Sequence, residues 1–217
     1  MSPEPVLEIY LINLRSNRTA LFTPTPAIEL FEQQSDDRIR RFVTWLSTRR
    51  FRIVAWLGRM LHMGHGYYVK LETRLDPNER VLKAMGLAER FVIFHSPSLD
   101  PAQVRRQFFS RLRRQCAKHF SWVIVDLVLS VASLAIAPLP GPNVIGWYPF
   151  LRSLSHYAAF YGTRRGLRSN KVEFRGLPEL RTLEENLQAP GFDRKRIHAI
   201  AEDLRWAGLE QFLERMT

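Results

Sequence analysis

Apolar and polar residues alternate in several short segments of the chain, and this pattern predicts a small number of strands. Residues 6–12 alternate and predict an opening strand, and residues 20–23 predict a second one that ends at Pro24 and Pro26. The segments 90–95 and 171–175 predict two more. Helices are expected near residues 178–187, 193–206 and 208–216, so the fold class is α+β and predominantly helical, with a few short strands.

The longest apolar pattern predicts a helical hairpin over residues 101–168. An apolar run at 120–137 is followed by a turn at 138–143 and by an aromatic-rich run at 144–161. Asp100 is a capping residue for a helix with Pro101 in its first turn, and neither Gly nor Pro follows until Pro138. We therefore predict three regions: residues 1–100 as an α+β region, 101–170 as the hairpin with its apolar tip, and 171–217 as a strand with helices.

Charge is concentrated around this hairpin. The whole chain carries a formal net charge of +11, and residues 101–172 contain eleven Lys and Arg residues but a single acid, Asp126. Because Lys and Arg stay on one side of a membrane, both ends of the hairpin would lie on the same face. The apolar run of eighteen residues at 120–137 would span about 27 Å as a helix, just short of a hydrocarbon core of about 30 Å. The hairpin therefore either crosses the bilayer twice or enters it and returns.

The basic flanks of the hairpin are candidates for contact with an anionic surface: Arg105, Arg106, Arg113, Arg114, Arg164, Arg165 and Arg168. A second basic region, residues 36–63, predicts an amphipathic helix that either lies on a membrane or presents a solvated face. Anionic membrane lipid is the first partner we expect. The alternative is a soluble basic helical domain whose apolar run is a buried core and which binds nucleic acid or another anionic partner.

Three ionisable residues are predicted to meet inside the hairpin: Asp126, Arg152 and His156. Helix rise places Asp126 at nearly the same distance from the turn as the other two, and an unpaired acid in an apolar setting is costly. Such a cluster either carries protons or contacts a cation, or it is a salt bridge that locks two helices together.

No catalytic, metal or cofactor motif accompanies this cluster. Phosphate loops, dinucleotide fingerprints and nucleophile elbows are absent, and the chain has one cysteine, Cys116. We therefore expect no enzyme, no cofactor and no metal. Residues 1–15 lack the features of a secretory signal or a transit peptide, which indicates a bacterial or already processed chain in a reducing compartment.

The turn and the segment after it resemble a known family. The sequence PLPGPN at 138–143, the aromatic stretch 147–150 and RSLSH at 152–156 are similar to the mitochondrial potassium/proton exchange-related protein family, and so are residues 9–12 and 21–23. The positions that match are Pro140, Gly141, Pro142, Asn143, Arg152, Ser155 and His156. The family supplies no catalytic residue to transfer.

The resemblance implies an inner-membrane-associated protein linked to monovalent cation (potassium) and proton balance. One hairpin cannot enclose a transport path, so we expect an accessory or regulatory protein, or a subunit of an ion-exchange complex, rather than a self-sufficient exchanger. Its location would be the inner face of a bacterial cytoplasmic membrane, or the mitochondrial inner membrane in a eukaryote; the soluble alternative would be cytoplasmic. The oligomeric state stays open.

Overall fold

The computed structural model describes residues 5–14, 19–31, 33, 77–134, 144–189 and 194–216. The predicted amphipathic helix at 36–63 lies outside these residues. The same holds for the predicted turn, which comprises Pro140, Gly141, Pro142 and Asn143. Both stay predictions.

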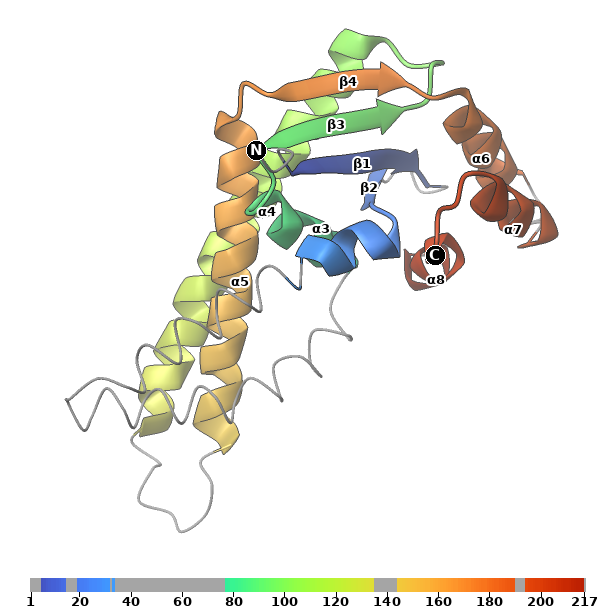
Figure 1. The fold of residues 1–217 in the computed structure, drawn as a ribbon. Coiled ribbons are helices and arrows are strands. Elements are labelled where there is room, and N and C mark those ends of the chain that lie inside the picture. Colours follow the sequence, from blue (N-terminus) through green and yellow to red (C-terminus); the bar gives the residue numbers. More distant parts are fainter. Residues whose placement is uncertain are drawn as a thin grey trace.

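A four-stranded sheet lies at one end of the described fold (Figure 1). Its strands are β1 (Val6–Asn13), β2 (Thr19–Phe22), β3 (Arg90–His95) and β4 (Val172–Gly176), in the order β2-β1-β3-β4. β1 pairs with β2 in antiparallel fashion, and the two strands confirm the predictions at residues 6–12 and 20–23. β1 also pairs with β3, and β3 with β4, in parallel fashion, so each of these connections must cross over through helices.

Helices fill the connections and follow the sheet. They are α3 (Pro77–Met85), α4 (Pro101–Leu134), α5 (Val144–Arg168), α6 (Pro178–Gln188), α7 (Arg194–Asp203) and α8 (Leu209–Met216), and residues 25–31 are also helical. Long helices with few short strands confirm the predicted α+β, predominantly helical class. The three predicted regions stay a prediction, and the sheet joins the first of them to the last through β4.

Alternating side chains of β1 contribute to two separate cores. Leu7 and Ile9 belong to the first core, together with residues of β3, α3 and the start of α4, such as Phe108. Tyr10 and Ile12 belong to the second core, which is completed by α6, α7, α8 and the residues between the last two. Successive side chains of a strand point to opposite faces, so one strand can anchor helices on both faces of the sheet.

The helical hairpin predicted from sequence is formed by α4 and α5, which lie side by side and lead away from the sheet (Figure 1). Asp100 caps α4, because its carboxylate oxygens accept the backbone N–H groups of Ala102 at 3.3 Å and Gln103 at 3.1 Å. From this cap α4 runs unbroken for 34 residues, or about 51 Å. One face of its first turns is buried in the first core, and its later turns pack mainly against α5.

Helix α3 packs against α5 through glycine. A Cβ atom added at Gly162 of α5 would overlap the backbone carbonyl oxygen of Leu82 in α3, and one added at Gly86, directly after α3, would lie 3.5 Å from the Cα atom of Gly162. The two backbones therefore approach more closely than any larger residue at 162 would allow. This crossing fixes the position of α3 beside the hairpin.

Replacing Gly162 with Ala should lower the free energy of unfolding by about 3 kcal/mol, because α3 must move away from α5 to admit the methyl group. The control is Gly176→Ala, since a Cβ there would meet Pro97 at an ordinary distance of 3.6 Å. The measurement is urea unfolding of the full chain in mild detergent, followed by circular dichroism. Equal stability of Gly162→Ala and the wild type would contradict the close crossing.

Candidate functional site

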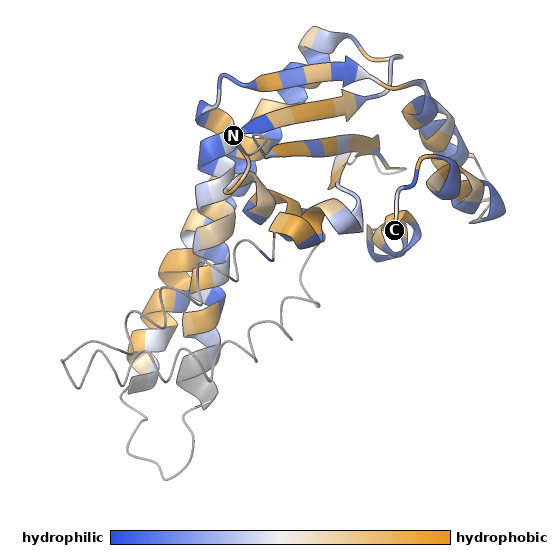
Figure 2. Cartoon of the chain, in the orientation of Figure 1, coloured by the Kyte–Doolittle hydropathy of each residue, from blue (hydrophilic) through white to orange (hydrophobic). Residues whose placement is uncertain are grey.

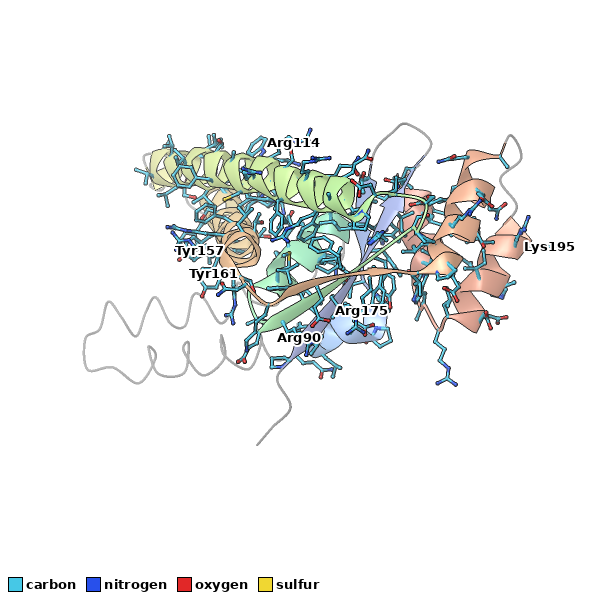
Figure 3. The ribbon with its side chains drawn as sticks, turned by 90° about the horizontal axis from the view of Figure 1, so that it is seen from above. Arg90, Arg114, Tyr157, Tyr161, Arg175 and Lys195 are labelled. Atoms are coloured by element: carbon cyan, nitrogen blue, oxygen red, sulfur yellow. The ribbon has the colours of Figure 1, made fainter. Side chains whose placement is uncertain are left out.

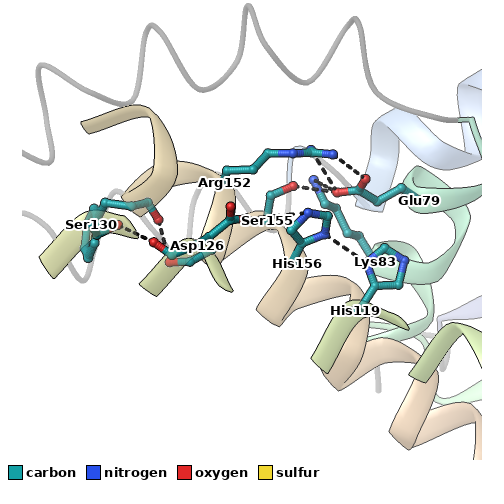
Figure 4. Close-up of polar contacts among 10 residues, drawn as sticks. Glu79, Lys83, His119, Asp126, Ser130, Arg152, Ser155 and His156 are labelled. Atoms are coloured by element: carbon teal, nitrogen blue, oxygen red, sulfur yellow. Dashed lines mark hydrogen bonds and ion pairs between the residues drawn. The ribbon is translucent and has the colours of Figure 1, made fainter. Parts of the chain in front are cut away.

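Buried and half-buried polar side chains gather where α3, α4 and α5 meet (Figure 4). We call them the polar cluster: Glu79 and Lys83 of α3, His119 and Asp126 of α4, and Arg152, Ser155 and His156 of α5. Helical spacing explains how each helix contributes. Residues three, four or seven positions apart share one face of a helix, and this holds for each group of contributors.

Glu79 holds α3 to α5 through its carboxylate. Ser155 donates a hydrogen bond to Oε1 of Glu79 at 2.6 Å, and the guanidinium of Arg152 lies 3.4 Å from each carboxylate oxygen. Lys83 completes the ion pairs at 3.7 Å. Burial would raise the pKa of Glu79, but Lys83, Ser155 and Arg152 together hold it below its ordinary value, so the carboxylate is ionised at neutral pH.

His119 and His156 face each other through the same ring atom. Their Nδ1 atoms lie 2.9 Å apart, and both side chains are buried. One Nδ1 must donate its hydrogen to the lone pair of the other, so the two rings cannot both be imidazolium while this contact exists. Trp122 stacks on His156 at 6.0 Å between ring centroids.

Asp126 lies on the far side of His156. Its Oδ2 atom is 3.7 Å from Nε2 of His156, which is longer than a hydrogen bond. This buried oxygen has no hydrogen-bond partner. The neighbouring Ser130 donates to the backbone carbonyl of Asp126 instead of to its carboxylate, at 2.7 Å.

The structure thus brings together Asp126, Arg152 and His156, as the sequence predicts, but their pairing differs from a direct pair of Asp126 with Arg152. Asp126 lies beside His156, whereas Arg152 pairs with Glu79. Sequence reasoning missed Glu79, Lys83 and the His119–His156 contact. The sequence signal for Glu79 and Lys83 was their i,i+4 spacing on a helix. This spacing is common on exposed helix surfaces, so it does not predict a buried ion pair unless the close crossing of α3 and α5 is known.

The basic residues that were predicted to contact an anionic surface lie on the half of the hairpin near the sheet. Those that are exposed form what we call the cationic band: Arg105, Arg106, Arg113, Arg114, Arg164 and Arg168. Arg165 is different. It is half-buried and donates a hydrogen bond to the carbonyl oxygen of Gly86 at 3.2 Å, so it helps to hold the end of α3.

Beyond the cationic band, exposed aromatic and then exposed aliphatic side chains follow along α4, and Tyr148 near the start of α5 is a further exposed aromatic residue. The aromatic band comprises Phe120, Trp122, Tyr157 and Tyr161, which are 47–55% exposed. The aliphatic band comprises Ile124, Val125, Leu127, Val128, Leu129 and Val131, which are 44–63% exposed. Figure 2 shows that hydrophobic, orange segments are frequent on the part of the hairpin away from the sheet, with blue segments among them, and Figure 3 labels Arg114, Tyr157 and Tyr161.

Helix α4 is long and apolar enough to cross a membrane over Pro101–Ser133. Core helices of soluble proteins pass the same test, but they are mostly buried, whereas 17% of the most apolar window of α4 is buried. This low burial distinguishes α4 from an ordinary core helix.

The polar cluster is not arranged as a metal centre. Asp126 lies beside Nε2 of His156, whereas His119 lies beside Nδ1 of His156. Asp126 and His119 therefore lie at different nitrogen atoms of the His156 ring and do not converge on one point. Within the part of the chain that the structure describes, no three His, Cys, Asp or Glu residues are grouped to hold a metal ion. Burial raises the pKa of the Cys116 thiol more than Arg164 lowers it, which disfavours the reactive thiolate.

A family model described as mitochondrial K+-H+ exchange-related matches residues 8–165, which is more than half of the chain. The chain belongs to this family. The match runs from β1 to the last turn of α5 and contains every residue of the polar cluster. The sheet strand β4 and helices α6 to α8 lie beyond it. No curated protein and no solved structure matches the chain.

Membership in the mitochondrial K+-H+ exchange-related family links the chain to monovalent cation and proton homeostasis. This confirms the resemblance that was found in the turn and in residues 152–156. The match contains the buried residues of the first core except Leu7, whereas helices α6 to α8, which complete the second core, lie beyond it.

Replacing Glu79 with Gln should lower the free energy of unfolding by about 3 kcal/mol at neutral pH, because Arg152 and Lys83 lose their buried counter-charge. The pKa of Glu79 is lowered in the folded state, so its contribution exists above the ordinary Glu pKa of about 4.3 and disappears as the pH falls through the native value. The difference between the two proteins should therefore shrink in acid, as measured by urea unfolding at a series of pH values.

The matched control is Glu185→Gln, which removes an exposed pair with Arg181 and should change stability by less than about 0.5 kcal/mol. A loss in Glu79→Gln that remains constant from neutral pH to well below about pH 4.3 would show that the charge of Glu79 is not what stabilises the contact.

Proposed function

We propose that this protein is a membrane-associated component of potassium and proton homeostasis, with an accessory or regulatory role rather than that of a self-sufficient exchanger. Family membership supports the link to K+-H+ exchange. The observation that carries the membrane association is the order of side chains along the hairpin: cationic, then aromatic, then aliphatic.

This order agrees with the layers of a bilayer. Arg and Lys favour the anionic headgroups, Trp and Tyr favour the interface, and aliphatic side chains favour the hydrocarbon. In the proposed arrangement the cationic band contacts anionic lipid, with each basic residue near the surface adding about 1 kcal/mol. The aliphatic band then enters the hydrocarbon, which removes its exposed surface from water.

The depth of insertion is limited by the length of the hairpin. From Trp122 to Leu134, α4 extends about 18 Å, against about 30 Å for a typical hydrocarbon core. The described part of α4 is therefore long enough to enter one leaflet from the side on which the sheet lies.

An accessory role fits the small amount of apolar helix. An exchanger usually surrounds a site near the bilayer midplane with several helices. In the described ranges, α4 is the helix that meets the length and composition for a membrane span. We infer a subunit or regulator of an ion-exchange complex, at the mitochondrial inner membrane or at the inner face of a bacterial cytoplasmic membrane, and we assign it no enzymatic activity.

The soluble alternative, in which the basic surface binds nucleic acid, has less support. It requires the apolar run to be a buried core. Eight large apolar side chains between Phe120 and Val131 are instead 44–63% exposed.

Flotation with liposomes tests membrane association. The full chain should float with cardiolipin-containing vesicles and remain bound in about 1 M salt, where electrostatic attraction reaches only about 3 Å. The double variant Val128→Arg, Val131→Arg should lose salt-resistant flotation by at least about tenfold, because it places charge in the hydrocarbon. The control, Gln103→Arg with Gln107→Arg, adds the same charge near the sheet and should float like the wild type.

Two results would oppose the proposal. One is flotation of the wild type that is lost in high salt, and the other is flotation of the Val128 and Val131 double variant at wild-type level. Salt-sensitive binding to nucleic acid without lipid would favour the soluble alternative instead.

The cation link is tested in membrane vesicles. Potassium-driven proton movement should fall in vesicles from cells that lack the protein and should recover when the full chain is expressed again. If the double variant of Val128 and Val131 also restored proton movement, the role in cation exchange would not require insertion of the hairpin into the membrane. Unchanged proton movement in the absence of the protein would contradict the link.

A further inference from the structure

We propose that His119, His156 and Asp126 form a proton relay within the hairpin, which accepts one proton at His119 and holds it at Oδ2 of Asp126. The inference deepens the proposed function, on which its physiological role rests, by naming the proton as the ligand of the polar cluster. The relay itself depends on the geometry of three side chains from α4 and α5 (Figure 4).

The first observation is the contact between the two histidines. With Nδ1 atoms 2.9 Å apart, a proton can pass from one ring to the other along an existing hydrogen bond. Two imidazolium rings would place two N–H groups against each other, so the pair can carry no more than one excess proton while the contact lasts.

The second observation is the condition of Asp126. Its Oδ2 is buried without a hydrogen-bond partner, and it points toward Nε2 of His156 at 3.7 Å. A buried carboxylate oxygen that accepts no hydrogen bond is energetically costly, and protonation removes this cost. A movement of the side chain by about 1 Å would bring the two atoms within the transfer distance of about 2.6–3.2 Å.

The transfer balances as follows. In the starting state His119 carries its proton on Nδ1, which donates to Nδ1 of His156, and His156 carries its proton on Nε2, toward ionised Asp126. An incoming proton binds Nε2 of His119, the Nδ1 proton of His119 passes to Nδ1 of His156, and the Nε2 proton of His156 passes to Oδ2 of Asp126. Two N–H bonds break, at Nδ1 of His119 and at Nε2 of His156. Two N–H bonds form, at Nε2 of His119 and Nδ1 of His156, together with the O–H bond of Asp126. The net change is the one added proton, so both rings end neutral and Asp126 is an uncharged acid.

The charges around the relay favour this final position. Glu79 and Lys83 face it from α3, and Arg152 from α5. With neutral histidines, Glu79 and Asp126 balance Lys83 and Arg152. A proton that stayed on an imidazole would be a cation next to Lys83 and Arg152, whereas on Asp126 it neutralises an anion. Glu79 does not compete for the proton, because Ser155, Arg152 and Lys83 stabilise its ionised form.

The test combines infrared spectroscopy and NMR on the full chain in lipid nanodiscs. After a jump to acidic pH, a carboxylic-acid carbonyl band should appear in the wild type and be absent from Asp126→Asn. In His119→Gln the band should reach the same final amplitude but form about a hundredfold more slowly, because the entry to the relay is lost while Asp126 is untouched. His198→Gln, which changes an exposed histidine of α7, should behave like the wild type.

Histidine nitrogen spectra of the wild type keep the inference testable even if a variant fails to fold. At neutral pH one Nδ1 should show a donor signal and the other an acceptor signal, coupled across the hydrogen bond. Two rings that titrate independently, the absence of an Asp126 band, or equal band formation rates in His119→Gln and the wild type would each overturn the relay. Flotation separates the two proposals, since membrane binding does not require proton transfer.

Discussion

The close approach of α3 to α5 is the constraint on which the polar cluster depends. Gly162 lets the backbone of α5 reach the carbonyl oxygen of Leu82, and one helical turn earlier in α3 lies Glu79. At this separation Glu79 can reach Arg152 and Ser155 across the interface. Without that carboxylate the half-buried Arg152 would lose its counter-charge, so the glycine contact and the ion pair support each other.

The hairpin separates two environments along one pair of helices. Near the sheet, Val104, Phe108 and Leu112 of α4 are buried in the first core while the arginines beside them are exposed. Farther along, the pattern reverses: Asp126 is buried and its apolar neighbours are exposed. Such an inversion is unfavourable in water and favourable in lipid, because polar groups must then face the protein interior.

Local signals in the sequence predict much of the fold. The alternation of residues 6–12, the cap at Asp100 and the uninterrupted run that follows it give β1 and α4 correctly, since strands and capped helices are specified by nearby residues. The parallel pairing of Val6 with Arg90 and of Phe91 with Val172 was not predictable in this way. These partners are far apart in the chain, and their pairing depends on how the helices between them pack.

For the candidate site too, features within one helix were predictable and contacts between distant helices were not. Helix rise predicted that Asp126 would lie at nearly the same depth in the hairpin as Arg152 and His156, and the structure buries Asp126 and His156 there. The pairing depends on the third helix, α3, because Arg152 forms its ion pair with Glu79 and the side chain that lies next to Asp126 is His156. The consequence is physical: had Arg152 paired with Asp126, that acid would be ionised and unable to accept a proton readily. The contact made by α3 thus determines which acid of the hairpin is stabilised as an anion and which one remains available for protonation.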